Sequence, residues 1–245
     1  MKRSHVIIGV LIILASAGLI EYYTESRFPT REIPLVIVPE LEIGKTHTFS
    51  YSREMQRVGT YSYTLSSKEN GIYTMISNTD VSFEGNSIQL ESSFMFDEKY
   101  SPQGYVLNVN QDGKENEIII TFQGGEAVST VNFDNETITT SSDFPEGGLL
   151  AENNMPGPWE VLLLSAQMES GERYRAKVYI PQGGKTFNLE FYVNENPKTV
   201  RINGEDISCD LIQESKLDLR FYFYEGELMQ MRNDDQDIIF TRLDG

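Results

Sequence analysis

Histidine is the scarcest of the side chains that could carry out chemistry in this chain. The 245 residues contain two histidines, and His5 lies in the export-like segment at the N-terminus. A Ser-His-Asp triad would therefore have to use His47, and a zinc site with two histidine ligands cannot form in the rest of the chain. His47 lies early in an expected strand, where a solvated or hydrogen-bonded edge residue is favoured. We expect no catalytic residue and no cofactor.

A glycine-rich stretch with a lysine resembles the end of a phosphate-binding loop, but its context excludes nucleotide binding. The stretch is Gly183-Gly184-Lys185-Thr186. The full motif needs an earlier glycine at the position that Tyr179 occupies, and a helix after the loop, where a strand is expected instead. The stretch predicts a hairpin turn.

Acidic residues are abundant, and they allow two further kinds of site. Residues 233–237 hold several oxygen ligands in one turn, but they lack the spacing and the central glycine of an EF-hand, so we expect no metal. A pair of carboxylates for glycoside hydrolysis stays open, because the separation of the pair depends on the tertiary structure. A carboxylate-based hydrolase is therefore a minor alternative.

Cys209 is the single cysteine, so an intrachain disulfide is impossible. Strand alternation places Cys209 on the same face as Ile207 and Leu211. This pattern predicts a buried and unreactive thiol.

Aromatic residues are the most informative positive feature of the sequence. The chain contains 13 tyrosines and 13 phenylalanines, mostly in expected strands. Where neighbours in a strand are both aromatic, both faces of the sheet carry large side chains. These side chains either fill a two-sided core or line a cavity for an apolar ligand. The candidate ligand-lining residues are Phe94, Phe96, Trp159, Phe191, Phe221 and Phe223.

The N-terminus has the layout of an export signal. Lys2 and Arg3 precede an uncharged, apolar segment at residues 6–20. Fifteen helical residues rise about 22 Å, which is shorter than the roughly 30 Å hydrocarbon core. Residues 15–17 form a small-x-small cleavage site. Residues 1–20 are therefore either a signal peptide cleaved near Ala17 or a membrane anchor, and both place the remaining chain outside the cytoplasm.

The rest of the chain divides into a spacer and one β-rich domain. Residues 21–45 contain three prolines and predict an extended spacer. From residue 46 to residue 245 the pattern is mainly period two, and turn signals such as Asn70-Gly71 recur about every ten residues. This pattern predicts a large antiparallel meander or half-barrel, preceded by an N-terminal hydrophobic helix.

One short helix interrupts the strands. Residues 143–158 hold several prolines and glycines and predict a loop. A helix is expected at about 158–169, opened by Pro158 and Trp159 and ended before Gly171. The fold class is therefore mainly β, with the meander wrapped around this helix.

The last third of the chain resembles a family of exported β-proteins that are broadly similar to periplasmic lipoprotein-carrier half-barrels. Three stretches carry the resemblance, and they are residues 203–209, 221–228 and 238–243. It implies a curved sheet around a helix, with lipid or peptide binding, and it implies no catalytic residue. The N-terminal half matches less well, and the chain lacks a lipid-attachment cysteine.

These patterns favour a non-enzymatic binding module with an apolar or lipid-like ligand. The alternative is a structural or protein-interaction domain of the cell envelope. A net charge of −17 repels nucleic acid and anionic headgroups, which excludes a nucleic-acid partner and limits contact with the membrane to the N-terminal segment. The charge also suits solubility, a salty or cation-rich exterior, or a basic partner, and charge alone does not choose among these.

Overall fold

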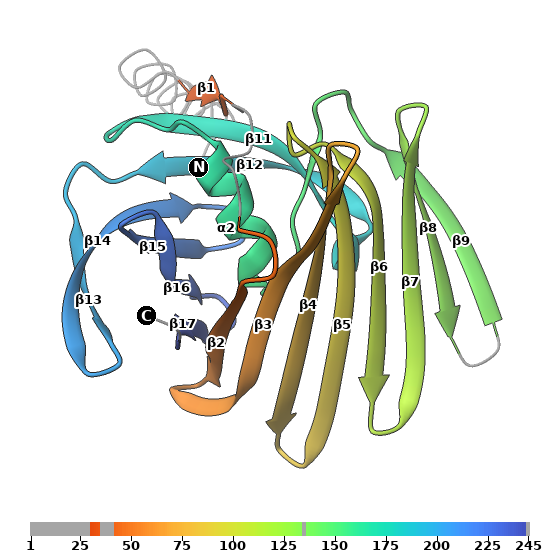
Figure 1. Ribbon diagram of the computed structural model, residues 1–245, viewed down its shortest axis with the longest axis horizontal. Coiled ribbons are helices and arrows are strands. Elements are labelled where there is room, and N and C mark those ends of the chain that lie inside the picture. Colours follow the sequence, from red (N-terminus) through yellow and green to blue (C-terminus); the bar gives the residue numbers. More distant parts are fainter. Residues whose placement is uncertain (1–29, 35–41, 134–135, 244–245) are drawn as a thin grey trace, which may run out of the picture.

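The described residues form one sheet of seventeen strands around one α-helix (Figure 1). The computed structural model describes residues 30–34, 42–133 and 136–243. The strands are β1 (Thr30–Glu32), β2 (Thr46–Arg53), β3 (Gln56–Glu69), β4 (Ile72–Phe83), β5 (Asn86–Asp97), β6 (Pro102–Gln111), β7 (Lys114–Gln123), β8 (Glu126–Phe133), β9 (Glu136–Asp143), β10 (Leu149–Leu150), β11 (Arg173–Ile180), β12 (Lys185–Val193), β13 (Lys198–Ile202), β14 (Glu205–Glu214), β15 (Leu219–Tyr224), β16 (Glu227–Asn233) and β17 (Ile238–Arg242). The helices are α2 (Pro156–Ser165) and the 3₁₀ turn η1 (Pro181–Gly183).

The strands follow one another as an antiparallel meander, except that the last strand, β17, pairs with β2. The run β11 to β17 is joined to the run β2 to β9 through the pairing of β17 with β2. The C-terminal strand therefore lies beside the first long strand, and we call this pairing the seam. The short strands β1 and β10 pair in parallel with β11, so the sheet is mostly, rather than wholly, antiparallel.

Alternation along each strand separates an inner face from an outer face. On β3, Tyr61, Tyr63 and Leu65 are buried, whereas the residues between them are partly exposed. Figure 1 shows α2 in the middle of the molecule, with strands β13–β17 on one side and β2–β9 on the other. The inner face is the one that packs toward α2, and the outer face is the opposite one.

Two glycine positions show how local sequence permits this packing. Asn70 and Gly71 both have positive φ, as the turn between β3 and β4 requires. At Gly157 in α2, an added Cβ would lie 2.6 Å from the Tyr61 hydroxyl oxygen, so the lack of a side chain lets the helix approach β3 closely.

The structure confirms the mainly β fold around one helix and corrects its details. The helix begins at Pro156 and ends at Ser165, earlier at both ends than expected, because the chain is already extended at Ala166. The expected loop 143–158 contains β10 and the first turn of α2, and the expected spacer contributes β1 to the sheet. The N-terminal hydrophobic helix falls outside the described residues. Neither described helix is long and apolar enough to cross a membrane.

A buried ion pair joins α2 to the seam. The Glu160 carboxylate of α2 accepts a hydrogen bond from Arg242 Nη1 of β17 at 3.0 Å, and the two side chains are 3% and 1% exposed. The Tyr63 hydroxyl and the Leu228 N–H also donate to this carboxylate, at 2.8 and 3.0 Å. Arg242 Nη2 contacts His47 Nδ1 on β2. Burial raises the pKa of the Glu160 carboxyl above its ordinary value, and the Arg242 charge opposes this rise.

A second buried carboxyl lies between the loop before α2 and the inner face. Glu152 is fully buried, and its Oε1 accepts a hydrogen bond from Ser92 Oγ at 2.8 Å. Its Oε2 has no hydrogen-bond partner among the described residues. Burial raises the pKa of the Glu152 carboxyl to about 7, and the Ser92 hydrogen bond opposes this rise. The protonated acid is therefore the form that suits the core at mildly acid pH.

Removing one partner of the Glu160–Arg242 ion pair is expected to destabilise the fold strongly. In Arg242→Met the Glu160 carboxylate stays buried without its cation, so the free energy of unfolding should fall by about 3–5 kcal/mol. The double variant Glu160→Met/Arg242→Met should lose less than Arg242→Met alone, because no buried charge is left unpaired. Urea denaturation measures the free energy of unfolding of the wild type, the single variant and the double variant. A double variant less stable than Arg242→Met would contradict this account.

The Glu152 carboxyl is expected to make stability fall with rising pH. Below pH 4.5 the acid is protonated in both states, whereas at higher pH the unfolded chain releases the proton first, which favours unfolding. The loss is complete once the pH passes about 7, and it amounts to at most about 3 kcal/mol at about 1.4 kcal/mol per pH unit. Denaturation at several pH values should show a weaker decline for Glu152→Gln than for the wild type. The control Glu205→Gln, at an exposed site, should decline as the wild type does.

Candidate functional site

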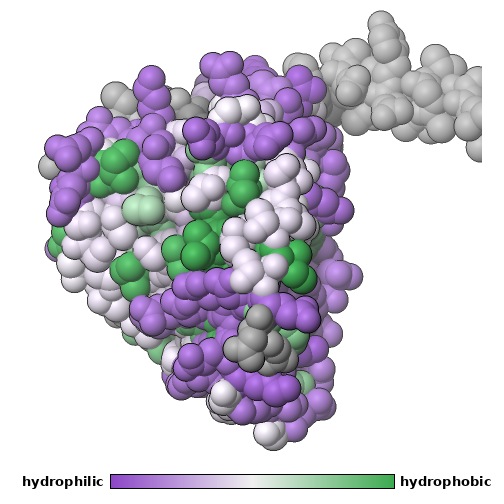
Figure 2. Space-filling view, turned by 90° about the vertical axis from the view of Figure 1, so that its right-hand side faces the viewer, coloured by the Kyte–Doolittle hydropathy of each residue, from purple (hydrophilic) through white to green (hydrophobic). Residues whose placement is uncertain are grey.

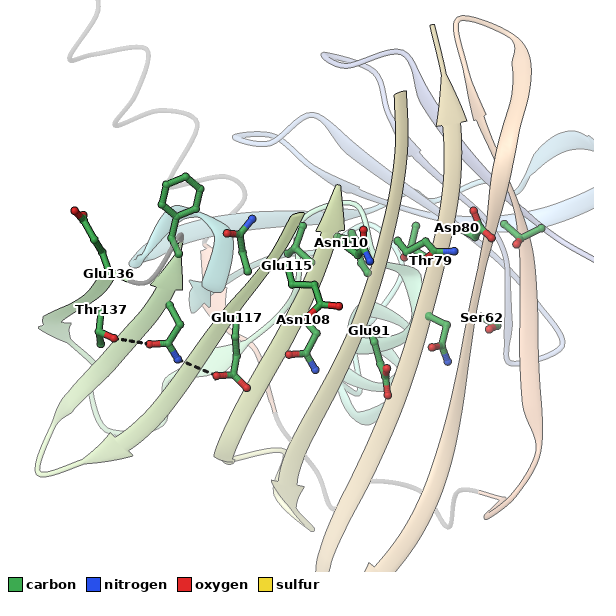
Figure 3. Close-up of a pocket in the computed structure, with 18 residues that line it drawn as sticks. Ser62, Thr79, Asp80, Glu91, Asn108, Asn110, Glu115, Glu117, Glu136 and Thr137 are labelled. Carbon is green, nitrogen blue, oxygen red and sulfur yellow. Dashed lines mark hydrogen bonds between the residues drawn. The ribbon is translucent and has the colours of Figure 1, made fainter. Parts of the chain in front are cut away.

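A groove of about 980 Å³ crosses the outer face of strands β3 to β9 (Figure 3). Its 18 lining residues come from all seven strands. Strand pairing sorts these residues into three parallel rows, because residues directly opposite each other in neighbouring strands share a face of the sheet.

The first row contributes one polar side chain from each of the seven strands. Each member is the direct partner of the next in the strand register. The row consists of Ser62, Asn78, Glu91, Asn108, Glu117, Asn132 and Thr137. Its side chains lie on the outer face, because Ser62 alternates with the buried Tyr61 and Tyr63.

The second row runs parallel to the first, two residues further along each strand. It consists of Thr60, Asp80, Gln89, Asn110 and Glu115. The remaining lining residues lie between the two rows and direct their side chains to the inner face, so their backbone forms the floor of the groove. These are Thr79, Leu90, Val109, Asn116, Phe133 and Glu136.

The dimensions of the groove follow from sheet geometry. Neighbouring strands lie about 4.8 Å apart, so the first row is about 29 Å long. Two residues along a strand separate the rows by about 7 Å. Figure 3 shows the labelled side chains in one band across successive strands. The groove therefore has the shape for an extended chain that crosses the strands.

The groove is strongly acidic. Four carboxylates point into it, from Asp80, Glu91, Glu115 and Glu117, whereas Glu136 borders it through its backbone. All 18 lining residues lie in the described ranges, and none of them is lysine, arginine or histidine. The other polar groups are mainly amides, which can both donate and accept hydrogen bonds. This lining favours a ligand that carries positive charge and hydrogen-bonding groups.

One end of the first row is already ordered by hydrogen bonds. Thr137 Oγ1 donates to Asn132 Oδ1 at 2.9 Å, and Asn132 Nδ2 donates to Glu117 Oε2 at 2.9 Å. The dashed lines in Figure 3 follow this chain of bonds. These bonds hold the Glu117 carboxylate in place, which reduces the entropy lost when a ligand binds it.

The structure places the six aromatic candidates in the interior. Their side chains are at most 7% exposed and belong to one buried cluster. The Trp159 ring of α2 packs against the rings of Phe191 and Phe221, with centroids 6.3 and 5.4 Å apart. Phe94 and Phe96 pack against each other at 5.0 Å, and Phe223 is 7% exposed. Phe191 also borders a hollow of about 310 Å³ whose other lining residues are mainly polar.

The other residues discussed from sequence have structural partners. Cys209 is fully buried with Leu211 and Tyr222, as alternation predicted. In the acidic turn, the Asn233 side chain accepts a hydrogen bond from the Gln236 N–H. The described ranges contain no group of three histidine, cysteine or acidic side chains placed to hold a metal ion.

Sequence reasoning missed the groove because its residues are spread over 78 positions, from Thr60 to Thr137. The signal was present in some of these strands as alternation of polar with apolar residues, as in Gln89-Leu90-Glu91 and Asn108-Val109-Asn110. Assigning those polar residues to one row requires the register of every strand pair, and a change of one residue in any register would disperse them.

No family model matches the sequence, and no curated protein is similar to it. The chain matches several solved structures, among which are two proteins of unknown function. One is a β-barrel-like protein of domain of unknown function DUF1849 from Brucella abortus, with 11% identity and a TM-score of 0.54, covering 81% of this chain and 94% of that one. The other is a DUF1089 family protein from Pseudomonas aeruginosa, with 13% identity and a TM-score of 0.42, covering 69% and 87%.

At these identities the likeness concerns the fold alone. The first structure supports a β-barrel-like fold for this chain. The comparisons do not show a link to lipoprotein carriers. This chain is similar in fold to a β-barrel-like domain of unknown function.

Proposed function

We propose that this chain is a non-enzymatic binding module that works outside the cytoplasm and holds an extended, basic segment of a partner protein in the outer-face groove. The observation that carries the proposal is the alignment of polar and acidic side chains from seven consecutive strands. A row built from so many strands offers contacts along the whole length of a ligand rather than at one point.

Charge supports a basic ligand. Four carboxylates point into the groove without a basic residue among its lining, and the whole chain carries a net charge of −17. Such a field attracts cations over long distances and accelerates association. The amides between the carboxylates pair with the peptide N–H and C=O groups that an extended segment presents.

The extracytoplasmic placement rests on the N-terminal sequence. Lys2 and Arg3 followed by the apolar residues 6–20 have the order of an export signal. The same segment accounts for either secretion or anchoring, and in both cases the domain would meet its partner outside the cytoplasm.

A lipid-like ligand among the aromatic residues stays a prediction, and the geometry favours it less. The six aromatic candidates pack against one another and against α2 in the core. An apolar ligand would have to displace these contacts, whereas a basic peptide enters a groove that is already open. The polar groove therefore supports the interaction alternative better.

Binding of a defined basic peptide tests the proposal. A labelled peptide of about ten residues that alternates lysine with serine spans about 33 Å and matches the groove in length. We expect saturable binding that weakens as salt is added, because the contacts are exposed ion pairs. Fluorescence anisotropy measures the Kd, and a peptide of the same length that alternates glutamate with serine should not bind.

Two matched variants locate the binding site. Glu91→Gln/Glu117→Gln should raise the Kd by about two- to thirtyfold, since each exposed ion pair contributes about 0.2–1 kcal/mol. Glu205→Gln/Asp210→Asn removes the same charge at exposed positions of β14, outside the groove, and should leave the Kd nearly unchanged. Equal weakening by both variants would show that net charge alone attracts the peptide and would refute the groove as the site.

A further inference from the structure

Strand β9 is one end of the sheet, and most of it is open to solvent. Its sole strand partner is β8 in the described sheet, and every β9 residue except Ser142 is exposed. Figure 1 shows β9 at the right-hand end of the strand series. Thr186 of β12 covers the last residue, because its Oγ1 donates to the Asp143 carbonyl oxygen at 3.0 Å.

The pairing with β8 determines which backbone groups of β9 are free. In an antiparallel pair, residues that exchange hydrogen bonds alternate with residues that do not. Phe144 N–H donates to Gly125 C=O at 2.8 Å, so by alternation Ile138 and Thr140 bond to β8. Thr137, Thr139 and Ser141 direct their N–H and C=O groups outward, where no partner lies among the described residues.

This edge lacks the features that usually prevent strands from pairing. Edge strands are commonly protected by lysine, proline or a bulge. The sequence Glu136–Asp143 contains neither lysine nor proline, and its pairing with β8 has no register shift. Two large apolar side chains are exposed nearby, Ile138 at 54% and Phe133 at 48%. Figure 2 views the molecule from this side and shows hydrophobic residues exposed in the middle of the face, with hydrophilic residues above and below.

We propose that β9 pairs with β9 of a second copy of this chain, antiparallel and with Thr139 on the twofold axis. Thr139 then faces Thr139 of the second copy, and Thr137 faces Ser141 of the second copy. All three outward-facing residues become hydrogen-bonding positions in this register, so the six free backbone groups of each copy find partners. The contact is isologous and closes after two subunits.

Side chains agree with the same register. Glu136 faces Ser142 of the second copy, so like charges do not meet directly. Ile138 faces Thr140 and lies diagonal to Ile138 of the second copy, within reach of an apolar contact on the inner face. The edge between Glu136 and Asp143 is uncharged, which suits another copy of itself better than the basic segment proposed for the groove.

The overall charge of the chain determines how the stability of this dimer depends on salt. Each copy carries −17, so the two copies repel each other although their edges match. Salt screens this repulsion and leaves backbone hydrogen bonds nearly unchanged. The dimer should therefore strengthen as salt is added, whereas peptide binding in the groove should weaken. The two proposals can fail independently.

A disulfide at the twofold axis tests the register. In Thr139→Cys, the facing Cα atoms would lie about 5.5 Å apart, a distance that a disulfide spans. Mild oxidation of the full chain in nonionic detergent should yield a covalent dimer on a non-reducing gel, and reductant should remove it. Thr121→Cys is the matched control, because Thr121 is exposed on β7, an interior strand. We expect about ten times less dimer from this control, since its thiols cannot meet in the proposed pairing.

A second variant keeps the test independent of cysteine chemistry. Thr139→Lys places two positive charges opposite each other on the axis, and sedimentation of the full chain should show loss of the dimer. The wild-type dimer fraction should rise between about 0.05 and 0.5 M salt. Equal cross-linking of both cysteine variants would overturn the proposal, and so would a Thr139→Cys product that contains a different protein.

Discussion

The buried ion pair between Glu160 and Arg242 is the contact on which the arrangement of the chain depends. Glu160 comes from the helix, Arg242 from the last strand, Tyr63 from β3 and the Leu228 N–H from β16. The carboxylate thus connects the helix to strands on both sides of the seam. Charges are seldom buried unless their hydrogen bonds are satisfied. The donors to the Glu160 carboxylate come from both ends of the domain, so these ends have to lie side by side for the carboxylate to be buried.

Because the interior is filled, a binding site has to lie on the outside of the sheet. Aromatic side chains from the inner face and Trp159 of the helix occupy the space that a ligand would need. The outer face of β3 to β9 has no packed layer over it in the described structure, and the side chains that point into its groove are polar. The same long strands therefore serve two purposes. Their inner residues stabilise the fold, and their outer residues form an aligned surface for binding.

Much of the fold was predictable because it depends on local chemistry. The alternation of Tyr61, Tyr63 and Leu65 with polar residues predicts β3, and Asn70-Gly71 predicts the turn after it. Cys209 was correctly expected in the interior. The limits of the helix were less predictable, because it is buried on nearly all sides and therefore lacks the polar face that marks a surface helix. The strand β1 was missed because its three residues have little pattern of their own and pair with β11 far along the chain.

The sequence by itself determined that this protein is a β-rich, acidic domain, that it has one short helix and a buried thiol, and that an export-like segment precedes it. These properties follow from residue types and their spacing within a few positions. Only the tertiary structure decided that aromatic residues fill a core, that Glu91 and Glu117 share one groove, and that β9 ends the sheet. The physical reason is that strand pairing joins residues distant in sequence, and the register of each pair is set by the packing of the whole sheet.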